Sequence, residues 1–461
     1  MTAPTLPDRP PFVLRVRILT PLADGGSRYE PDGALAVDAA GRIAAVGPWP
    51  LGPGEGRNAP PRRPASGGPT VDLRPLLLLP GMVDLHVHLP QLPNAGVGAG
   101  LDLLTWLERY IFPLERAFDA ATAEWVAPAA FRAMAAAGTT TALMYGAVFE
   151  PSLDVAFQAA EAHGIRAIIG KVMMDRLTYD DRLPADRILE TSLRQSADLC
   201  ARWHGRDDGR LLYAFTPRFA VSCTPEMLAE SATLARQTGA YWQTHLSEDV
   251  TELREVARLF PDAHDYLDVY DRAGGLGPRT VLAHAIHLSP REVARLAESG
   301  SAVAHCPASN FFLSSGAMPL ARYRAAGIRV GLGSDVAAGP ELSIFANMRA
   351  GAYIQNGLRV VEGSMAAPVL GPLDWLRMGT LEGARALGLD GRIGSLEPGK
   401  EADAIVVDPR LTAPIEGLDS DDPAELMSRL AFRPHPDMVR AAWVRGRRLD
   451  GPLGLAEAAP E

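Results

Sequence analysis

The 461-residue chain is poor in cysteine and lysine and contains no long basic run. Its three cysteines, Cys200, Cys223 and Cys306, are widely spaced and form no C-x-x-C pair, which argues against a disulfide framework and a thiolate zinc cluster. We expect buried or half-buried thiols instead. The only lysines are Lys171 and Lys400, and no basic run is available to neutralise a phosphate backbone. Nucleic acid is therefore not an expected partner.

Long apolar segments are also missing. Apolar runs such as residues 76–79 fall far short of the roughly 20 residues that a membrane-spanning helix needs. The first ten residues, MTAPTLPDRP, lack the basic, apolar and small-residue pattern of a secretory signal. We therefore expect no membrane association and predict a cytoplasmic protein. The hydrophobic fraction of 47%, the charged fraction of 22% and the net charge of -10 fit an ordinary globular chain.

Short extended stretches with Gly/Pro-rich turns occur at both ends of the chain. They cover residues 12–18, 35–37 and 43–46, with turns over 52–75, and then 404–407 and 438–444, with a turn at 445–447. We expect the two sets to pair into one small β unit.

Eight apolar runs rich in β-branched residues lie between these ends, separated by helical periodicity or by loops. The runs end near His86, Met144, Val172, Phe215, His245, His284, Cys306 and Gly333. Segments such as residues 290–298 predict amphipathic helices. The alternation is typical of a parallel α/β sheet, and eight strands favour a closed (β/α)8 TIM barrel of about 250 residues. Catalytic residues of such a barrel gather at the carboxyl ends of its strands.

Histidine and aspartate recur at those strand ends. His86 and His88 form H-x-H, and residues two apart on a strand point to the same face. His245, His284 and Asp335 end or follow three further predicted strands. Imidazole with carboxylate suits zinc or ferrous iron, so the pattern predicts one metal ion at this end of the barrel. Glu248 follows His245 by three residues and is placed to move protons without binding the metal.

Several motifs resemble the amidohydrolase superfamily. They are PGMVDLHVH at 80–88, THLSE at 244–248, the Ala-His pair at 283–284, GSD at 333–335 and GSLEPGKEAD at 394–403. Narrower motifs are similar to those of the guanine deaminases, namely HLPQ at 88–91, LTWLERYIFPLE at 104–115, GKVMMD at 170–175, TPRF at 216–219 and HCPASN at 305–310. The chain resembles that family along most of its length.

The resemblance implies a metal-bearing barrel with a composite β-sandwich built from both termini. The corresponding domains are residues 1–78 and 393–461 for the sandwich and 79–392 for the barrel. It also implies a homodimer and one zinc ion per chain, with iron as the alternative. Matching positions assign the metal ligands to His86, His88, His245 and Asp335, water orientation to His284, the proton shuttle to Glu248, and purine binding to Gln91, Arg218 and Phe219.

The reaction that the resemblance implies is hydrolytic deamination of guanine at C2, which gives xanthine and ammonia. Glu248 would protonate the adjacent ring nitrogen, Asp335 would accept the water proton and His284 would hold the nucleophile. Gln91 and Arg218 suit the oxo and amide edge of a purine base, the expected small-molecule ligand.

Three departures from the guanine deaminase pattern leave related substrates open. VAAGPE at 336–341 is bulkier than the usual glycine-rich run, Phe149 stands where histidine is common, and Leu177-Thr178 replaces a more polar pair. The alternatives are 8-oxoguanine, a pterin or an aminotriazine. Two other classes of function are also open. One is a two-metal cyclic amidase, in which a carbamylated Lys171 would bridge the metal ions, and the other is a non-catalytic scaffold. The segment 101–118, with Trp106 and Phe112, would line the pocket or contact a second subunit.

Overall fold

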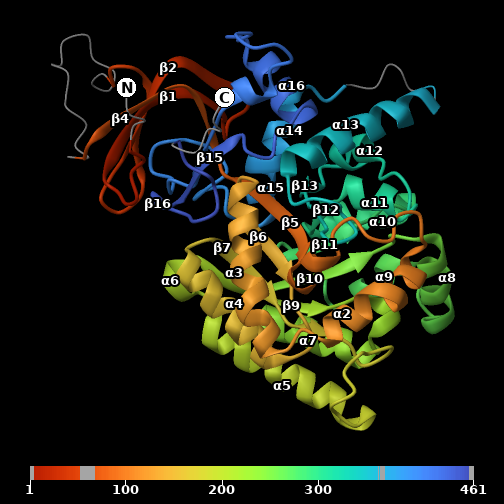
Figure 1. The fold of residues 1–461 in the computed structure, drawn as a ribbon. Coiled ribbons are helices and arrows are strands. Elements are labelled where there is room, and N and C mark those ends of the chain that lie inside the picture. Colours follow the sequence, from red (N-terminus) through yellow and green to blue (C-terminus); the bar gives the residue numbers. More distant parts are fainter. Residues whose placement is uncertain (1–4, 52–67, 362, 364–368, 456–461) are drawn as a thin grey trace.

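A central barrel of parallel strands and a separate mixed sheet make up the fold (Figure 1). The structure, a computed structural model, describes residues 5–51, 68–361, 363 and 369–455. Among these residues, no helix combines the length and the apolar character that a membrane span requires.

The barrel contains the eight predicted strands in sequence order, each parallel to its neighbours. Its strands are β5 (Met82–His88), β6 (Thr139–Tyr145), β7 (Arg166–Gly170) with its short continuation β8 (Val172–Met173), β9 (Leu211–Pro217), β10 (Tyr241–Leu246), β11 (Thr280–His284), β12 (Ala302–His305) and β13 (Arg329–Leu332). The circle closes beyond β13, where the Asp335 nitrogen donates to the His86 carbonyl at 2.7 Å and the His88 nitrogen donates to the Val336 carbonyl at 3.0 Å. The predicted (β/α)8 barrel is confirmed.

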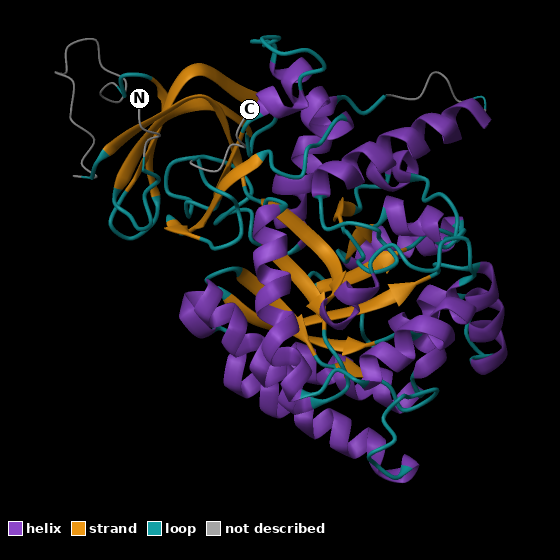
Figure 2. Cartoon of the chain, in the orientation of Figure 1, coloured by secondary structure: helices purple, strands orange, loops and turns teal. Residues whose placement is uncertain are grey.

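Helices surround the barrel strands on the outside (Figure 2). The longer ones are α3 (Ala120–Ala136), α4 (Glu150–His163), α5 (Ala185–Trp203), α7 (Pro225–Thr238), α8 (Val250–Leu259), α9 (Tyr266–Arg272), α10 (Pro290–Ser299), α13 (Ile344–Val361) and α16 (Pro423–Phe432). Shorter ones are η1 (Leu89–Asn94), α1 (Leu103–Trp106), η2 (Leu107–Ile111), α2 (Phe112–Arg116), α6 (Arg206–Gly209), η3 (Ala220–Ser222), α11 (Pro307–Phe312), α12 (Leu320–Ala325), α14 (Pro372–Arg377), η4 (Met378–Glu382), α15 (Gly383–Ala386) and η5 (Pro409–Thr412).

Helix α10 shows why these segments were predictable. The Ser289 hydroxyl caps its first turn by accepting a hydrogen bond from the Glu292 nitrogen, and the Glu292 carboxylate accepts one from the Ser289 nitrogen. Gly300 ends the helix with a φ of 68°, a left-handed conformation that glycine adopts without a steric penalty. The apolar residues Val293 and Leu296 lie on its buried face.

The terminal strands form one seven-stranded mixed sheet, which confirms the predicted pairing of the two ends. Its order is β16 (Arg447–Arg448), β15 (Val439–Val444), β14 (Ala404–Val407), β4 (Thr70–Pro80), β1 (Phe12–Pro21), β2 (Ser27–Val37) and β3 (Ile43–Pro48). The junction is the antiparallel pair β4 and β14, in which Leu78 lies opposite Val406.

The leucine run at residues 76–79 serves two cores because side chains on a strand alternate between faces. Leu76 and Leu78 pack into the core of the mixed sheet, whereas Leu77 and Leu79 pack into the large core beside the barrel. This junction fixes the position of β5, which starts two residues after β4 and carries the H-x-H motif.

One predicted boundary is wrong. The turn-rich stretch was expected to extend to Pro75, but strand β4 begins at Thr70 and pairs with β1 from Val13 onward. Thr70, Asp72 and Arg74 are exposed and polar, so their composition hides the strand. The part of that stretch at 52–67 lies outside the described residues. Cys200, Cys223 and Cys306 are free and buried, as expected.

Candidate active site

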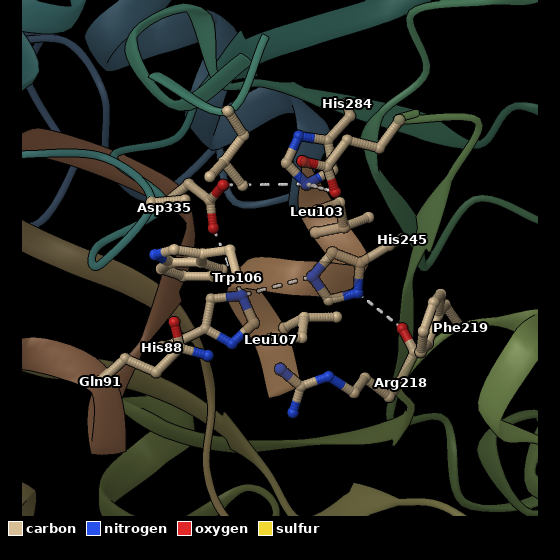
Figure 3. A pocket seen from close by; sticks show the side chains of 13 residues that line it. His88, Gln91, Leu103, Trp106, Leu107, Arg218, Phe219, His245, His284 and Asp335 are labelled. Carbon is tan, nitrogen blue, oxygen red and sulfur yellow. Dashed lines mark hydrogen bonds and ion pairs between the residues drawn. The ribbon is translucent and has the colours of Figure 1, made fainter. Parts of the chain in front are cut away.

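Residues from six barrel strands and the segments that follow them line a cavity at the carboxyl ends of the strands (Figure 3). The lining residues are His88, Gln91, Leu103, Trp106, Leu107, Arg218, Phe219, His245, Glu248, His284, Leu313, Asp335 and Ala338. His86 lies within the same cluster at 1% exposure. The structure thus brings together every site residue named from the sequence.

Three imidazole nitrogens and one carboxylate oxygen converge at the floor of this cavity. His88 Nε2 lies 3.2 Å from His86 Nε2 and 3.3 Å from His245 Nε2. Asp335 Oδ1 lies 3.1 Å from His86 Nε2 and 3.3 Å from His88 Nε2. Ligand atoms held about 2.0–2.1 Å from a tetrahedral zinc ion stand about 3.3–3.4 Å apart. The cluster therefore has the spacing of a divalent-metal site.

The protonation of these side chains suits metal binding. Burial lowers the pKa of His88 to about 4 and the pKa of His245 well below its usual range, so both rings are neutral near pH 7. His245 Nδ1 donates to the Arg218 carbonyl at 2.6 Å, which leaves the lone pair of Nε2 for a metal. Burial alone would raise the pKa of Asp335, but the His86 and His88 rings outweigh it and hold that pKa well below its usual range.

Local backbone geometry aims these ligands. The register of β5 against β6 shifts between Asp84 and Val87, and a bulge of this kind redirects side chains at a strand end. Asp335 has a φ of 50°, which a non-glycine residue adopts only at a cost, and its nitrogen is held by the His86 carbonyl. The strained residue is thereby locked against the H-x-H strand.

Glu248 and His284 lie beside the cluster. His284 Nδ1 donates to Asn310 Oδ1 at 2.9 Å, and its Nε2 faces Glu248 Oε2 at 3.3 Å and Asp335 Oδ2 at 3.8 Å. Glu248 is 2% exposed, so it is not a solvated residue at a helix start. Burial, reinforced by repulsion from Asp335, raises the pKa of Glu248 well above its usual range. This shift favours the protonated form of the carboxyl group, which can donate a proton.

The opposite wall carries the polar groups expected to bind a base. Gln91 and Arg218 both contact Glu115, which is fully buried. The Arg218 guanidinium lies over the Phe112 ring at 5.4 Å. The Phe219 ring stands edge-on to His245, with centroids 6.4 Å apart. A cationic and amide wall thus faces the metal cluster across the cavity.

Apolar residues of segment 101–118 cover the cavity. Leu103, Trp106 and Leu107 line it, and the Trp106 indole nitrogen donates to the Val97 carbonyl at 3.0 Å. Trp106 is 2% exposed within a single chain. Of the two roles considered for this segment, the structure assigns these residues to the pocket wall.

Four polar residues that support the site were not predicted from the sequence. They are Asp84, Glu115, Asn310 and Ser315, whose hydroxyl donates to Glu248 Oε1 at 3.3 Å. The first three lie inside motifs named above. Glu115 could have been found because it is an acidic residue in a largely apolar segment, which indicates a buried partner. Nothing in the sequence around Ser315 indicates that it supports the site.

The departures from the family pattern touch the cavity at one place. Ala338 lines it, and the Ala337 nitrogen donates to Gln91 Oε1 at 3.3 Å. Phe149 instead packs against Tyr179, with ring centroids 6.2 Å apart, and Leu177 is 62% exposed. Lys171 donates to Ser192 Oγ at 2.9 Å and is not part of the metal cluster, which disfavours the carbamylated bridge of a two-metal amidase.

Comparison with known proteins agrees with this geometry. The model of the Amidohydrolase family matches residues 77–449. A probable guanine deaminase of Deinococcus radiodurans is 42% identical over 82% of this chain and 83% of its own length. The guanine deaminase of Escherichia coli K12 is 39% identical over 78% of this chain and 79% of its own. A crystal structure of guanine deaminase from C. acetobutylicum with guanine in its active site covers 95% of this chain and 99% of that one, at 28% identity and a TM-score of 0.85. The chain therefore belongs to the amidohydrolase family and, within it, to the guanine deaminases.

Proposed function

We propose that the protein hydrolyses guanine to xanthine and ammonia, with one zinc ion held by His86, His88, His245 and Asp335. The observation that carries this proposal is the convergence of their donor atoms at 3.1–3.3 Å beside a cavity that Gln91 and Arg218 also line.

Neutral imidazoles with one carboxylate are a donor set that zinc and ferrous iron share, and the guanine deaminase resemblance favours zinc. When bound, the ion acts as a Lewis acid that makes water a stronger nucleophile near neutral pH. Metal analysis of protein purified without added metal distinguishes zinc from iron.

The surrounding side chains move the protons. Asp335 Oδ2 accepts the proton that the water loses, and His284 Nε2 holds the water over C2 of the base. Glu248 donates its proton to the ring nitrogen beside C2. The water oxygen forms the new bond to C2, and its remaining proton passes to Glu248 as the C2 carbonyl forms. The bond from C2 to the exocyclic nitrogen breaks, and that nitrogen takes the proton held by Asp335, so ammonia leaves and both carboxyl groups return to their starting states.

The remaining residues bind the base and keep bulk water out. Gln91 and Arg218 donate N–H groups to the acceptor atoms of the oxopurine, and Phe219 packs against the ring. Leu103 and Trp106 line the cavity with apolar side chains, which strengthens each of these hydrogen bonds by lowering the local dielectric.

Ammonia release by the metal-analysed protein tests the substrate. Guanine, 8-oxoguanine, isoxanthopterin, an aminotriazine and cytosine are compared side by side. We expect guanine to have the highest kcat/KM. If another base is preferred, guanine deamination is the wrong activity and the loop at 336–341, which reaches the cavity through Ala338, becomes the element to exchange.

We also propose that the protein is a cytoplasmic homodimer; the guanine deaminase resemblance favours the dimer. Light scattering on the purified protein distinguishes the 49.2 kDa chain from an assembly of twice that mass. A monomer at micromolar concentration would contradict the dimer.

A further inference from the structure

Glu115 lies behind the two residues that face the base. It is in α2, is fully buried, and belongs to neither the metal cluster nor the cavity lining. Its Oε1 accepts a hydrogen bond from Gln91 Nε2 at 2.6 Å, and its Oε2 forms a short ion pair with Arg218 Nη1. Gln91 comes from η1 and Arg218 follows β9, so one carboxylate joins side chains from three separate segments.

This contact determines which way the Gln91 amide points. Its nitrogen donates to Glu115, and its oxygen accepts from the Ala337 nitrogen at 3.3 Å. A flipped amide would set its oxygen against the Glu115 carboxylate and its nitrogen against an N–H donor, so both contacts would be repulsive. The nitrogen of the Gln91 amide is therefore fixed on the Glu115 side, and its second N–H is the donor that it offers to a ligand.

Glu115 also supplies the counterion that the buried Arg218 requires. Arg218 is 2% exposed, and an unpaired guanidinium at that depth would be costly. The ion pair occupies Nη1 on one side, and the Phe112 ring lies 5.4 Å from the guanidinium carbon. These two contacts restrict the plane in which the free N–H groups of Arg218 lie.

We propose that Glu115 is a positioning residue for purine binding: it holds Gln91 and Arg218 together so that their free N–H groups are presented to the base. A base that turns oxo oxygen and ring-nitrogen acceptors toward these groups is bound, and a base with an amino group there meets donor against donor. The inference rests on the proposed guanine deaminase activity and extends it to a residue outside the cavity lining.

The test compares steady-state kinetics of the metal-loaded wild type with those of Glu115→Gln, which keeps the shape of the side chain but removes its charge. We expect KM for guanine to rise at least about 30-fold while kcat changes less than about 3-fold and metal content stays the same. Glu108→Gln, on the exposed side of the neighbouring η2, is the matched control and should leave KM unchanged.

A double mutant separates positioning from general damage. Because Glu115 acts through its partners, adding Gln91→Ala to Glu115→Gln should raise KM by less than about 3-fold beyond Glu115→Gln alone. Fully additive effects would overturn the inference. If Glu115→Gln is insoluble, Glu115→Asp replaces it in the test. The shorter carboxylate cannot reach both Gln91 and Arg218, so KM should rise. A wild-type KM in that variant would overturn the inference.

The outcomes also separate the inference from the activity on which it rests. A wild type that releases no ammonia from guanine refutes the proposed function. An active wild type whose KM is insensitive to Glu115→Gln refutes the role of Glu115 alone.

Discussion

Both carboxylate oxygens of Asp84 accept hydrogen bonds from Ser334, one from its backbone nitrogen at 2.9 Å and one from its hydroxyl at 2.5 Å. Asp84 precedes His86 by two residues, and Ser334 precedes Asp335 by one. The pair therefore joins the strand that carries the H-x-H motif to the loop that carries the carboxylate ligand. It sets the separation of ligands that come from opposite ends of the barrel sheet.

Ser334→Ala should weaken metal binding without abolishing folding. The substitution removes the hydroxyl bond but leaves the backbone bond, and partners that orient metal ligands typically account for about 10- to 100-fold in affinity. Titration against a competing chelator measures the change. An affinity equal to that of the wild type would show that β5 and the loop after β13 hold their positions without this contact.

Glu248→Gln should retain the metal and lose turnover. The amide has the shape of the carboxyl group but no acidic proton, so kcat should fall at least about 100-fold. Metal content and the unfolding temperature should match those of the wild type. Glu226→Gln, on the exposed surface of α7, serves as the control. Substantial activity in Glu248→Gln would remove the proton shuttle from the mechanism.

Asn310→Leu tests the orientation of His284. The Asn310 oxygen keeps the proton on His284 Nδ1 and so leaves Nε2 free to accept from Glu248 or water. Without that acceptor the ring can rotate or adopt the other tautomer, and kcat should fall about 10- to 100-fold with little change in metal content. A change confined to KM would place Asn310 in base binding instead.

The barrel could be predicted because each strand is an apolar run, and four of the eight runs lead to a histidine or aspartate of the site. His245, His284 and Asp335 follow such runs directly, and the closed topology brings the carboxyl ends of the strands together. The β unit was predictable from its short extended stretches between turns. The exception is the start of β4 at Thr70, which is exposed and polar and so has the composition of a loop.

The supporting contacts could not be predicted. Glu115 and Arg218 are 103 positions apart, and Asp84 and Ser334 are 250 apart. Which residue of a helix meets which strand end depends on the loop paths and on the register of the barrel, and neither is encoded in local periodicity. A buried acidic residue in an apolar segment signals that a partner exists but does not identify it.

Lys171 has a buried amino group at the end of the third barrel strand. It donates to Ser192 Oγ at 2.9 Å and to the Val172 carbonyl at 3.4 Å. Burial lowers the pKa of Lys171 from 10.5 to about 8, although the charges of Asp180 and Glu150 oppose the shift. The folded protein therefore binds this proton less tightly than the unfolded chain does.

The free energy of unfolding should consequently rise with pH as Lys171 loses its proton. Below pH 8 the buried ammonium costs about 3 kcal/mol, and the cost disappears as the pH rises from 8 to 10.5. Lys171→Met removes the titration, so its unfolding free energy relative to the wild type should fall by about 2 kcal/mol between pH 7 and pH 9.5. Urea unfolding at the two pH values measures this difference. Lys400→Met, which removes an ammonium 3.2 Å from the Glu397 carboxylate, controls for the loss of a lysine. A Lys171→Met difference that is constant with pH would mean that water or a counterion reaches the amino group and keeps it charged in the folded state.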